Sequence, residues 1–281
     1  MSLRIIVDSG SDILPDEAKE LGVTHLPLKV VFNGEEFEDA VNLTHKEFYE
    51  KLIESDALPT TCQVAPSVFE DAIRSALDNG DDALVITVSG KLSGTYQSAC
   101  IAASEFGDRV AVVDSESVSL GIRILVQRAA SMRDEGKSLH EITTVLNEEK
   151  KKIRVLALLD TLEYLKKGGR ISKAVAFAGT MLSIKPVVTV ADGEVVLLGK
   201  ARGSRQGNNL LRELVVQRGI DFSRPLCLAY SGLSDALLKK YILDSADLWR
   251  DHADSLPVAT VGCAIGTHVG PGAVAVAFFE K

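Results

Sequence analysis

The stretch DALVITVSGKLSGTYQSAC, residues 82–100, decides the fold because it joins two kinds of local pattern. Its first part, 82–89, is a continuous apolar run rich in β-branched residues, which is typical of a strand buried on both faces of a sheet. A helix pattern follows over 94–105. A buried strand, a short polar corner and a helix in this order predict an α/β layer architecture.

Three further apolar runs have the same character as residues 82–89. They are LRIIVD (3–8), RVAVVDS (109–115) and IRVLALLD (153–160). Helix patterns separate these runs and lie at 15–21, 44–55, 66–78, 94–105, 117–135 and 138–152. The alternation predicts an N-terminal α/β domain over residues 1–160, with a mainly parallel sheet flanked by helices.

The pattern changes after Gly168. IKPVVTV and VVLLGKAR are apolar runs joined through Asp192-Gly193, which predicts a β-hairpin. The remaining patterns predict a helix at 204–219, a strand at 225–230, a helix at 234–250 and a last strand pair around 257–280. We therefore predict a second domain over 161–281, of α+β class with a mixed or antiparallel sheet.

Composition excludes several classes of function. The chain has 281 residues, of which 46% are hydrophobic, and a net charge of -8 that disfavours nucleic acids and anionic membranes as partners. No apolar run approaches the roughly 18 residues of a membrane span, so we expect no stable membrane insertion. Four scattered cysteines without a C-x-x-C pair argue against zinc and against a disulfide framework. These features predict a cytoplasmic protein.

Polar residues end the predicted strands, where ligands of open α/β sheets bind. They are Asp8-Ser9, Ser89 with Ser93, Asp114-Ser115 and Asp160-Thr161, and helix capping is an alternative explanation for each pair. The Ser93-Gly94-Thr95 corner has features of a ligand-binding site in addition to those of a helix cap. Glycine lets the backbone approach a ligand, Ser93 offers a hydroxyl, and the first N–H groups of the following helix are free. The corner predicts an anion-binding site.

Three other stretches contain candidate site residues. In PTTCQVAP (59–66), Thr61 and Gln63 precede a helix and either bind a ligand or cap that helix. In AIGTHVGPGAVAV (264–276), the glycines predict a loop that brings His268 to a ligand or holds it for structural reasons. A basic group predicts either a docking patch for an acidic or phosphorylated partner or a solvated face. Its members are Lys166, Lys167, Arg170, Lys173, Lys200, Arg202 and Arg205.

Cofactor motifs are incomplete in this sequence. Gly90-Lys91 is followed by Leu92, so no P-loop is formed, and the spacing of Asp8 and Asp12 lacks the other residues of a calcium loop. We expect neither a metal nor a cofactor. A serine-dependent acyl hydrolase using Ser93 and His268 is the alternative hypothesis. The sequence does not support it, because Ser93 lies in GKLSG and not in a G-x-S-x-G nucleophile elbow.

Several motifs occur in an order that resembles the DegV family, the bacterial fatty acid-binding proteins that serve fatty acid kinase. They are VDSGSDI, PTTCQVAPS, SGKLSGTYQSA, VVDSESVSLG, LLDTLEYLKKGGRIS, MLSIKPV and THVGPGAVAV, and together they cover essentially the whole chain. The resemblance implies a carrier that encloses one long-chain fatty acid, such as palmitate, stearate or oleate, between two domains. It also implies that a separate kinase uses ATP to convert this acid to an acyl-phosphate for phospholipid metabolism.

The resemblance also implies roles for individual residues. Thr61 and Ser93 bind the carboxylate with the backbone around Gly94, and His268 is the histidine of the T-H-x-G-P-G motif. Arg202 and Arg170 belong to the head-group end and the kinase contact.

The sequence departs from the family pattern beside this site. Thr61-Cys62-Gln63-Val64 stands where the family commonly has T-S-Q-P, and Ser89-Gly90 replaces a doubled serine. Both changes leave Thr61 and Ser93 in place, and Cys62 is predicted to make the site sensitive to oxidation. The apolar stretch AVAFAGTML (174–182) is predicted to line the acyl tunnel or to pack in an ordinary core.

Overall fold

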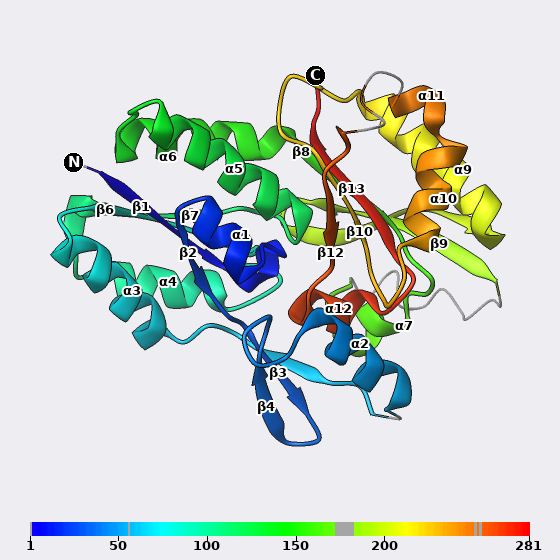
Figure 1. Cartoon of the computed structure of the whole chain (residues 1–281), viewed down its shortest axis with the longest axis horizontal. Helices are drawn as coiled ribbons and strands as arrows, with labels where there is room; N and C mark the ends of the chain where they lie inside the picture. Colours follow the sequence, from blue (N-terminus) through cyan, green and yellow to red (C-terminus); the bar gives the residue numbers. More distant parts are fainter. Residues whose placement is uncertain (1, 56, 172–182, 250–251, 253–254) are drawn as a thin grey trace.

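Three β-sheets organise the chain in the computed structural model, which describes residues 2–55, 57–171, 183–249, 252 and 255–281 (Figure 1). The predicted tunnel segment 174–182 and Lys173 lie outside the described residues. Among the helices in these ranges, none has both the length and the apolar character needed to span a bilayer.

The N-terminal sheet has the predicted parallel arrangement. Its strand order is β2 (Val23–Leu26), β1 (Leu3–Asp8), β6 (Asp82–Thr87) and β7 (Val110–Asp114). Helices cover both faces, which explains the continuous apolar runs. The helices of this region are α1 (Pro15–Glu20), α2 (His45–Glu54), α3 (Pro66–Asp78), α4 (Thr95–Ala103), α5 (Leu120–Asp134) and α6 (Leu139–Glu149).

The second sheet is mixed, also as predicted. Its strand order is β10 (Glu194–Arg202), β9 (Ile184–Ala191), β8 (Ile153–Leu158), β13 (Val274–Phe279), β11 (Cys227–Tyr230) and β12 (Val258–Thr260). The hairpin prediction is confirmed, because β9 and β10 pair antiparallel and both turn residues have positive φ, 49° at Asp192 and 76° at Gly193. The described helices between β8 and β12 are α7 (Glu163–Lys167), α9 (Gly203–Arg218), α10 (Ala236–Asp244) and α11 (Ala246–Trp249).

The prediction that residues 153–160 form a strand of the parallel sheet is wrong. Strand β8 pairs antiparallel with β13 and β9 in the mixed sheet. A strand buried on both faces has the same continuous apolar pattern in either sheet, so the sequence run could not distinguish the two. The domain boundary at residue 160 stays a prediction.

Two further predictions near the C-terminus are corrected. Strands β12 and β13 are not partners of each other, because β11 lies between them. The segment around His268, predicted as a glycine-rich loop, is helix α12 (Cys263–Val269). Backbone donors at the start of α12 bind side chains from distant segments, and this tertiary support outweighs the low helix propensity of its glycine.

A small antiparallel sheet was not predicted. It consists of β4 (Glu35–Glu38), β3 (Lys29–Phe32) and β5 (Thr60–Cys62). Figure 1 shows β3 and β4 projecting below the parallel sheet, with α2 and α12 beside them. This sheet contains Thr61 in β5, so the predicted capping loop is a strand at that position.

Helix α5 joins the two large sheets into one packed unit. Ile122, Ile124 and Leu125 are fully buried and share a hydrophobic cluster with Ile5 of β1 and Ala277 of β13. The opposite face of the mixed sheet packs in a separate cluster against α9, α10 and α11. The layers therefore run from α3 and α4 through the parallel sheet, α5 and the mixed sheet to α9–α11 (Figure 1).

Candidate functional site

A cavity of about 350 Å³ lies between β5, the turn before α4, and helix α12. Its polar lining consists of Thr61, Gln63, Ser93, Arg170 and His268. Its apolar lining consists of Leu28, Val88, Leu92, Val118, Leu165, Val195, Ala264, Ile265 and Val269, and Cys62 and Gly94 complete the wall. An apolar cavity of this size with a few polar groups is typical of a small-molecule binding site.

Ser93 offers a hydroxyl proton to this cavity. Its Oγ accepts a hydrogen bond from the N–H of Thr95 at 3.3 Å and lies 2.9 Å from Thr95 Oγ1. Thr95 Oγ1 in turn accepts from the N–H of Val64 at 3.4 Å, so its own proton can go to Ser93. Ser93 then acts as an acceptor toward the helix start, as the capping alternative requires, and keeps its proton for a ligand.

Gly94 contributes a backbone donor. Among the described residues, none accepts a hydrogen bond from its N–H, which precedes the first turn of α4 at the positive end of that helix. The Gln63 side chain lies over this glycine: a Cβ at position 94 would be 1.9 Å from Gln63 Oε1. Gln63 Nε2 donates to Ser98 Oγ at 2.8 Å, which holds the amide in this position.

His268 lies next to Thr61, with 3.1 Å between His268 Nε2 and Thr61 Oγ1. The other ring nitrogen, Nδ1, is buried, has no hydrogen-bond partner within the described part of the chain, and lies against Gly168, where a Cβ would be 2.3 Å away. A buried N–H without an acceptor costs about 1–3 kcal/mol, so the ring proton belongs on Nε2. His268 then donates to Thr61, whose own hydroxyl proton is left for a ligand.

The histidine is neutral near pH 7. Burial lowers the pKa of His268 to about 4, and the positive charge of Arg170 acts in the same direction. Arg170 is held by backbone oxygens: its Nε donates to Leu92 O at 3.1 Å and its Nη1 to Gly168 O at 2.7 Å. Two hydroxyl protons, the Gly94 N–H and a nearby guanidinium together form an environment suited to a carboxylate.

Two buried carboxylates position α12, and neither was predicted as a site residue. Asp39 accepts hydrogen bonds from the N–H groups of Cys263 at 2.9 Å and Ala264 at 3.1 Å, and from Ser9 Oγ at 3.0 Å. Asp12 accepts from the N–H of Gly262 at 2.9 Å and from Ser119 Oγ. Negative groups at a helix N-terminus are stabilising, so these contacts fix α12 and with it His268.

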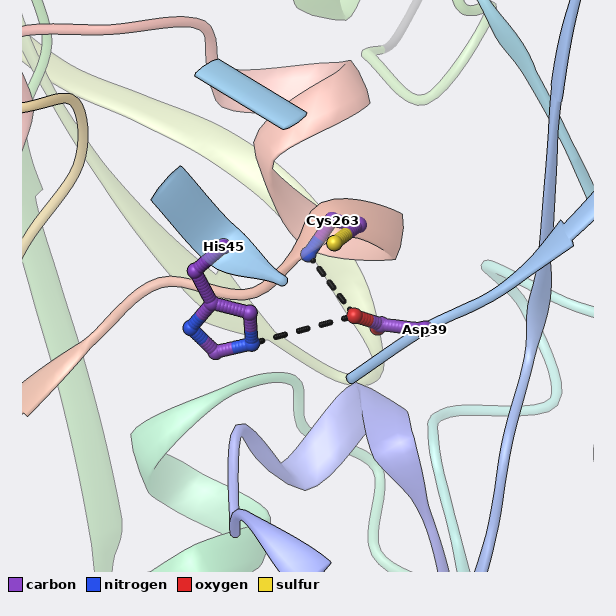
Figure 2. A group of neighbouring side chains, drawn as sticks. All are labelled: Asp39, His45 and Cys263. Carbon is purple, nitrogen blue, oxygen red and sulfur yellow. Dashed lines mark hydrogen bonds and ion pairs between the residues drawn. The ribbon is translucent and has the colours of Figure 1, made fainter. Parts of the chain in front are cut away.

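Figure 2 shows the Asp39 carboxylate joined by dashed lines to the ring of His45 and to the backbone nitrogen of Cys263. The ligand atoms of these three residues lie within 4.8 Å of one another, as in a potential metal site. Each group already has another contact. Both Asp39 oxygens accept hydrogen bonds, His45 Nδ1 lies 2.8 Å from Thr260 Oγ1, and the Cys263 thiol lies 3.5 Å from Leu43 O. Burial raises the pKa of that thiol far above its ordinary value. We assign the group to capping of α12.

The geometry does not favour the hydrolase alternative. An activated serine needs a base within hydrogen-bonding reach, and the base needs an orienting group. Ser93 instead bonds to Thr95, and His268 bonds to Thr61. In the described ranges, no carboxylate contacts either ring nitrogen of His268.

Comparison with known proteins assigns nearly the whole chain to one family. The model of the DegV family, described as an uncharacterised protein family, matches residues 2–281. The chain belongs to the DegV family. A DegV domain-containing protein of Deinococcus radiodurans is 36% identical over 283 residues, covering 99% of this chain and 98% of that protein.

Solved DegV structures have the same fold. A fatty acid-binding DegV protein from Thermus thermophilus matches with a TM-score of 0.88 and 34% identity, covering 100% of both chains. A DegV protein from Eubacterium eligens loaded with heptadecanoic acid matches with a TM-score of 0.83 and 25% identity, again over 100% of both chains.

The predicted site residues of this DegV protein divide into two groups. Thr61, Ser93, Gly94, His268 and Arg170 all line the cavity. Arg202 does not: it ends β10 and is exposed. Two other predicted strand-end residues make structural contacts: Asp8 accepts from the N–H groups of Gly10 and of the distant Val88, and Ser89 Oγ donates to Gly193 O in the β9–β10 turn at 2.7 Å.

We expect His268 to make the stability of this DegV protein depend on pH. Because its folded-state pKa lies below the unfolded value, the neutral ring stabilises the fold above about pH 6.5, and this contribution is lost as the pH falls toward 4. His268→Gln should reduce the loss of unfolding free energy between pH 7 and pH 4 by about 3 kcal/mol. Urea unfolding at both pH values measures this difference.

The matched control is His140→Gln, which changes an exposed histidine on α6 and should behave as the wild type. An equal pH dependence in the wild type and in His268→Gln would contradict the assignment of a buried, neutral His268.

Proposed function

We propose that this protein binds one long-chain fatty acid, with its carboxylate at Thr61, Ser93 and Gly94, and presents it to a separate fatty acid kinase. The observation that carries the proposal is the pair of hydroxyl groups, of Thr61 and Ser93, that line a largely apolar cavity, each within hydrogen-bonding distance of one neighbouring side chain. The related Thermus thermophilus and Eubacterium eligens proteins, described with bound fatty acids, support the same ligand class.

The polar end selects a carboxylate. A buried carboxylate needs donors to replace water, and each hydrogen bond to a charged group contributes about 1.5–3 kcal/mol. His268 and Thr95 orient the two hydroxyls, so the donors are ordered before the ligand arrives. This arrangement lowers the cost of binding, because less side-chain freedom is lost.

The apolar part supplies most of the affinity. At about 0.8 kcal/mol for each buried methylene, fourteen methylenes give on the order of 11 kcal/mol before the cost of ordering the chain. We therefore expect a saturated or monounsaturated acid of about 14–18 carbons, a range in which the tail buries enough surface for tight binding.

The kinase partner accounts for the chemistry that the cavity lacks. Within the described residues, neither Ser93 nor His268 forms a catalytic pair, so the site holds the acid without reacting with it. Exposed cations near the hairpin offer a surface for an acidic partner, and Lys200 and Arg202 have no ion pair among the described residues. We assign the kinase contact to this surface, with Arg202 at its centre.

Mass spectrometry of lipid extracted from the purified protein tests the proposal directly. The expected result is one equivalent of a long-chain fatty acid, or stoichiometric loading with palmitate or oleate after delipidation. A protein that yields no fatty acid and cannot be loaded would overturn the proposal.

Ser93→Ala should weaken fatty acid binding by about 1–3 kcal/mol, because one donor to the carboxylate is lost. Thr61→Ala should have a similar effect, and the double variant should bind more weakly than either. Titration with a fluorescent fatty acid measures the dissociation constants.

Ser93→Thr is the matched control because it keeps the hydroxyl, and it should lose less affinity than Ser93→Ala. If Ser93→Ala binds as tightly as the wild type, the hydroxyl only supports the start of α4 and the carboxylate lies elsewhere.

Arg202→Ala should lower acyl-phosphate formation by the kinase and leave fatty acid binding nearly unchanged, because Arg202 is exposed and does not line the cavity. The two measurements are the rate of acyl-phosphate formation and the dissociation constant of the fluorescent fatty acid. Arg74→Ala, at an exposed arginine on α3, is the control and should affect neither. Equal loss of both properties in Arg202→Ala would place this arginine in the binding site.

A further inference from the structure

A second cavity, of about 60 Å³, lies beyond the first. The two cavities share five apolar lining residues, namely Val118, Leu165, Val195, Ile265 and Val269. Because these side chains line both cavities, the second cavity adjoins the first, and we name it the distal cavity. Ser93 and Thr61 line only the larger cavity, so the distal cavity adds apolar space beside it without adding to its polar group.

The floor of the distal cavity is a row of small side chains across the mixed sheet. Ala275 of β13 and Ala157 of β8 are direct cross-strand partners, and Ala157 is also paired with Val188 of β9. All three line the distal cavity. On the other face of the same strands, Leu156, Leu158, Val274 and Val276 pack against the outer helices.

Alanine at these two positions is unusual for the centre of a sheet. Strand interiors favour β-branched and aromatic side chains, which fill the pleated surface. The ordinary explanation for a small side chain there is close packing of a helix, and it fits Ala229, the partner of Ala275 on β11, which packs in the cluster that contains α5. Ala275 belongs to the same cluster and Ala157 packs against it, but both alanines also line the distal cavity, which Ala229 does not. Their small side chains therefore leave the space of the distal cavity open.

The distal cavity has no free polar group among its described lining residues. Its two hydroxyl-bearing residues are already engaged: Thr189 Oγ1 donates to Val155 O at 2.8 Å, and Ser119 Oγ donates to Asp12. An apolar cavity without free hydrogen-bonding groups does not hold water well. It suits a methyl terminus and disfavours a polar one.

We propose that Ala157 and Ala275 set the upper limit of acyl chain length, with the distal cavity receiving the terminal methyl end of an unsubstituted chain. This inference rests on the proposed fatty acid function and adds to it a preference for a certain acyl chain length. The hydroxyl corner fixes one end of the ligand, so the distance to the alanine floor decides how many methylenes can be buried. Larger side chains at the floor should then discriminate against long chains without affecting the carboxylate contacts.

The test compares the affinities of delipidated full-length variants for myristate and stearate, by displacement of a fluorescent fatty acid. Excluding two methylenes from the cavity costs about 1.6 kcal/mol, which corresponds to roughly a tenfold change in affinity. Ala157→Val and Ala275→Val should each raise the ratio of the stearate to the myristate dissociation constant about tenfold. Val188→Ala, which enlarges the floor, should lower this ratio.

Ala229→Val is the matched control, since it adds the same atoms to the same cross-strand row outside both described cavities. Its stearate to myristate ratio should equal that of the wild type. An ω-hydroxylated palmitate should bind the wild type about tenfold more weakly than palmitate, because its hydroxyl is buried without a partner.

The outcomes separate this inference from the proposed function. A wild-type protein that binds neither acid contradicts the function itself. The role of the alanine floor alone is contradicted if the wild type binds tightly and the stearate to myristate ratio of dissociation constants is unchanged in three folded variants. These variants are Ala157→Val, Ala275→Val and Val188→Ala. If a valine variant does not fold, the opposite shift expected for Val188→Ala decides the question.

Discussion

The candidate site depends on the two buried carboxylates at the start of helix α12. Asp39 and Asp12 together accept backbone hydrogen bonds from Gly262, Cys263 and Ala264. Burial raises the pKa of Asp12 to about 7, because the charged form loses hydration, and the donors from Gly262 and Ser119 offset part of that cost. What these buried carboxylates contribute is the position of helix α12. A helix of seven residues has little stability of its own, yet these contacts hold it as one wall of the cavity.

The described polar lining of the cavity consists mainly of neutral side chains in hydrogen-bonded pairs, with a single charged group. His268 orients Thr61, and Thr95 orients Ser93. Arg170 is the one cation among the described lining residues, and its guanidinium is bonded to backbone oxygens. A carboxylate held in this way is fixed by orientation as much as by charge. Under the proposed function, such a site holds the carboxylate by hydrogen bonds alone, so that the separate kinase can still phosphorylate it.

The sequence identified several residues that line the cavity, but not the secondary structure or the distant contacts that position them. A hydroxyl next to a glycine at the start of a helix is a local pattern, so Ser93 and Gly94 could be found without a structure. Asp39 could not, because no motif marks it and its partners, Cys263 and Ala264, are more than 220 residues away in the chain. The helical state of His268 was missed for the same reason.

The same limit explains the errors in the fold. Hydrophobic patterns identified most helices and long strands, and the Asp192-Gly193 turn was correctly predicted because its chemistry is local. The run at 153–160 was placed in the wrong sheet, since burial on both faces produces one pattern for parallel and antiparallel strands. Ala157, on that strand, lines the distal cavity, while Thr61 and Ser93 line the larger cavity beside it. The complete binding space therefore exists only when α5 and α12 hold the two large sheets and the small sheet together, and a ligand that fills it must stabilise this packing by mass action.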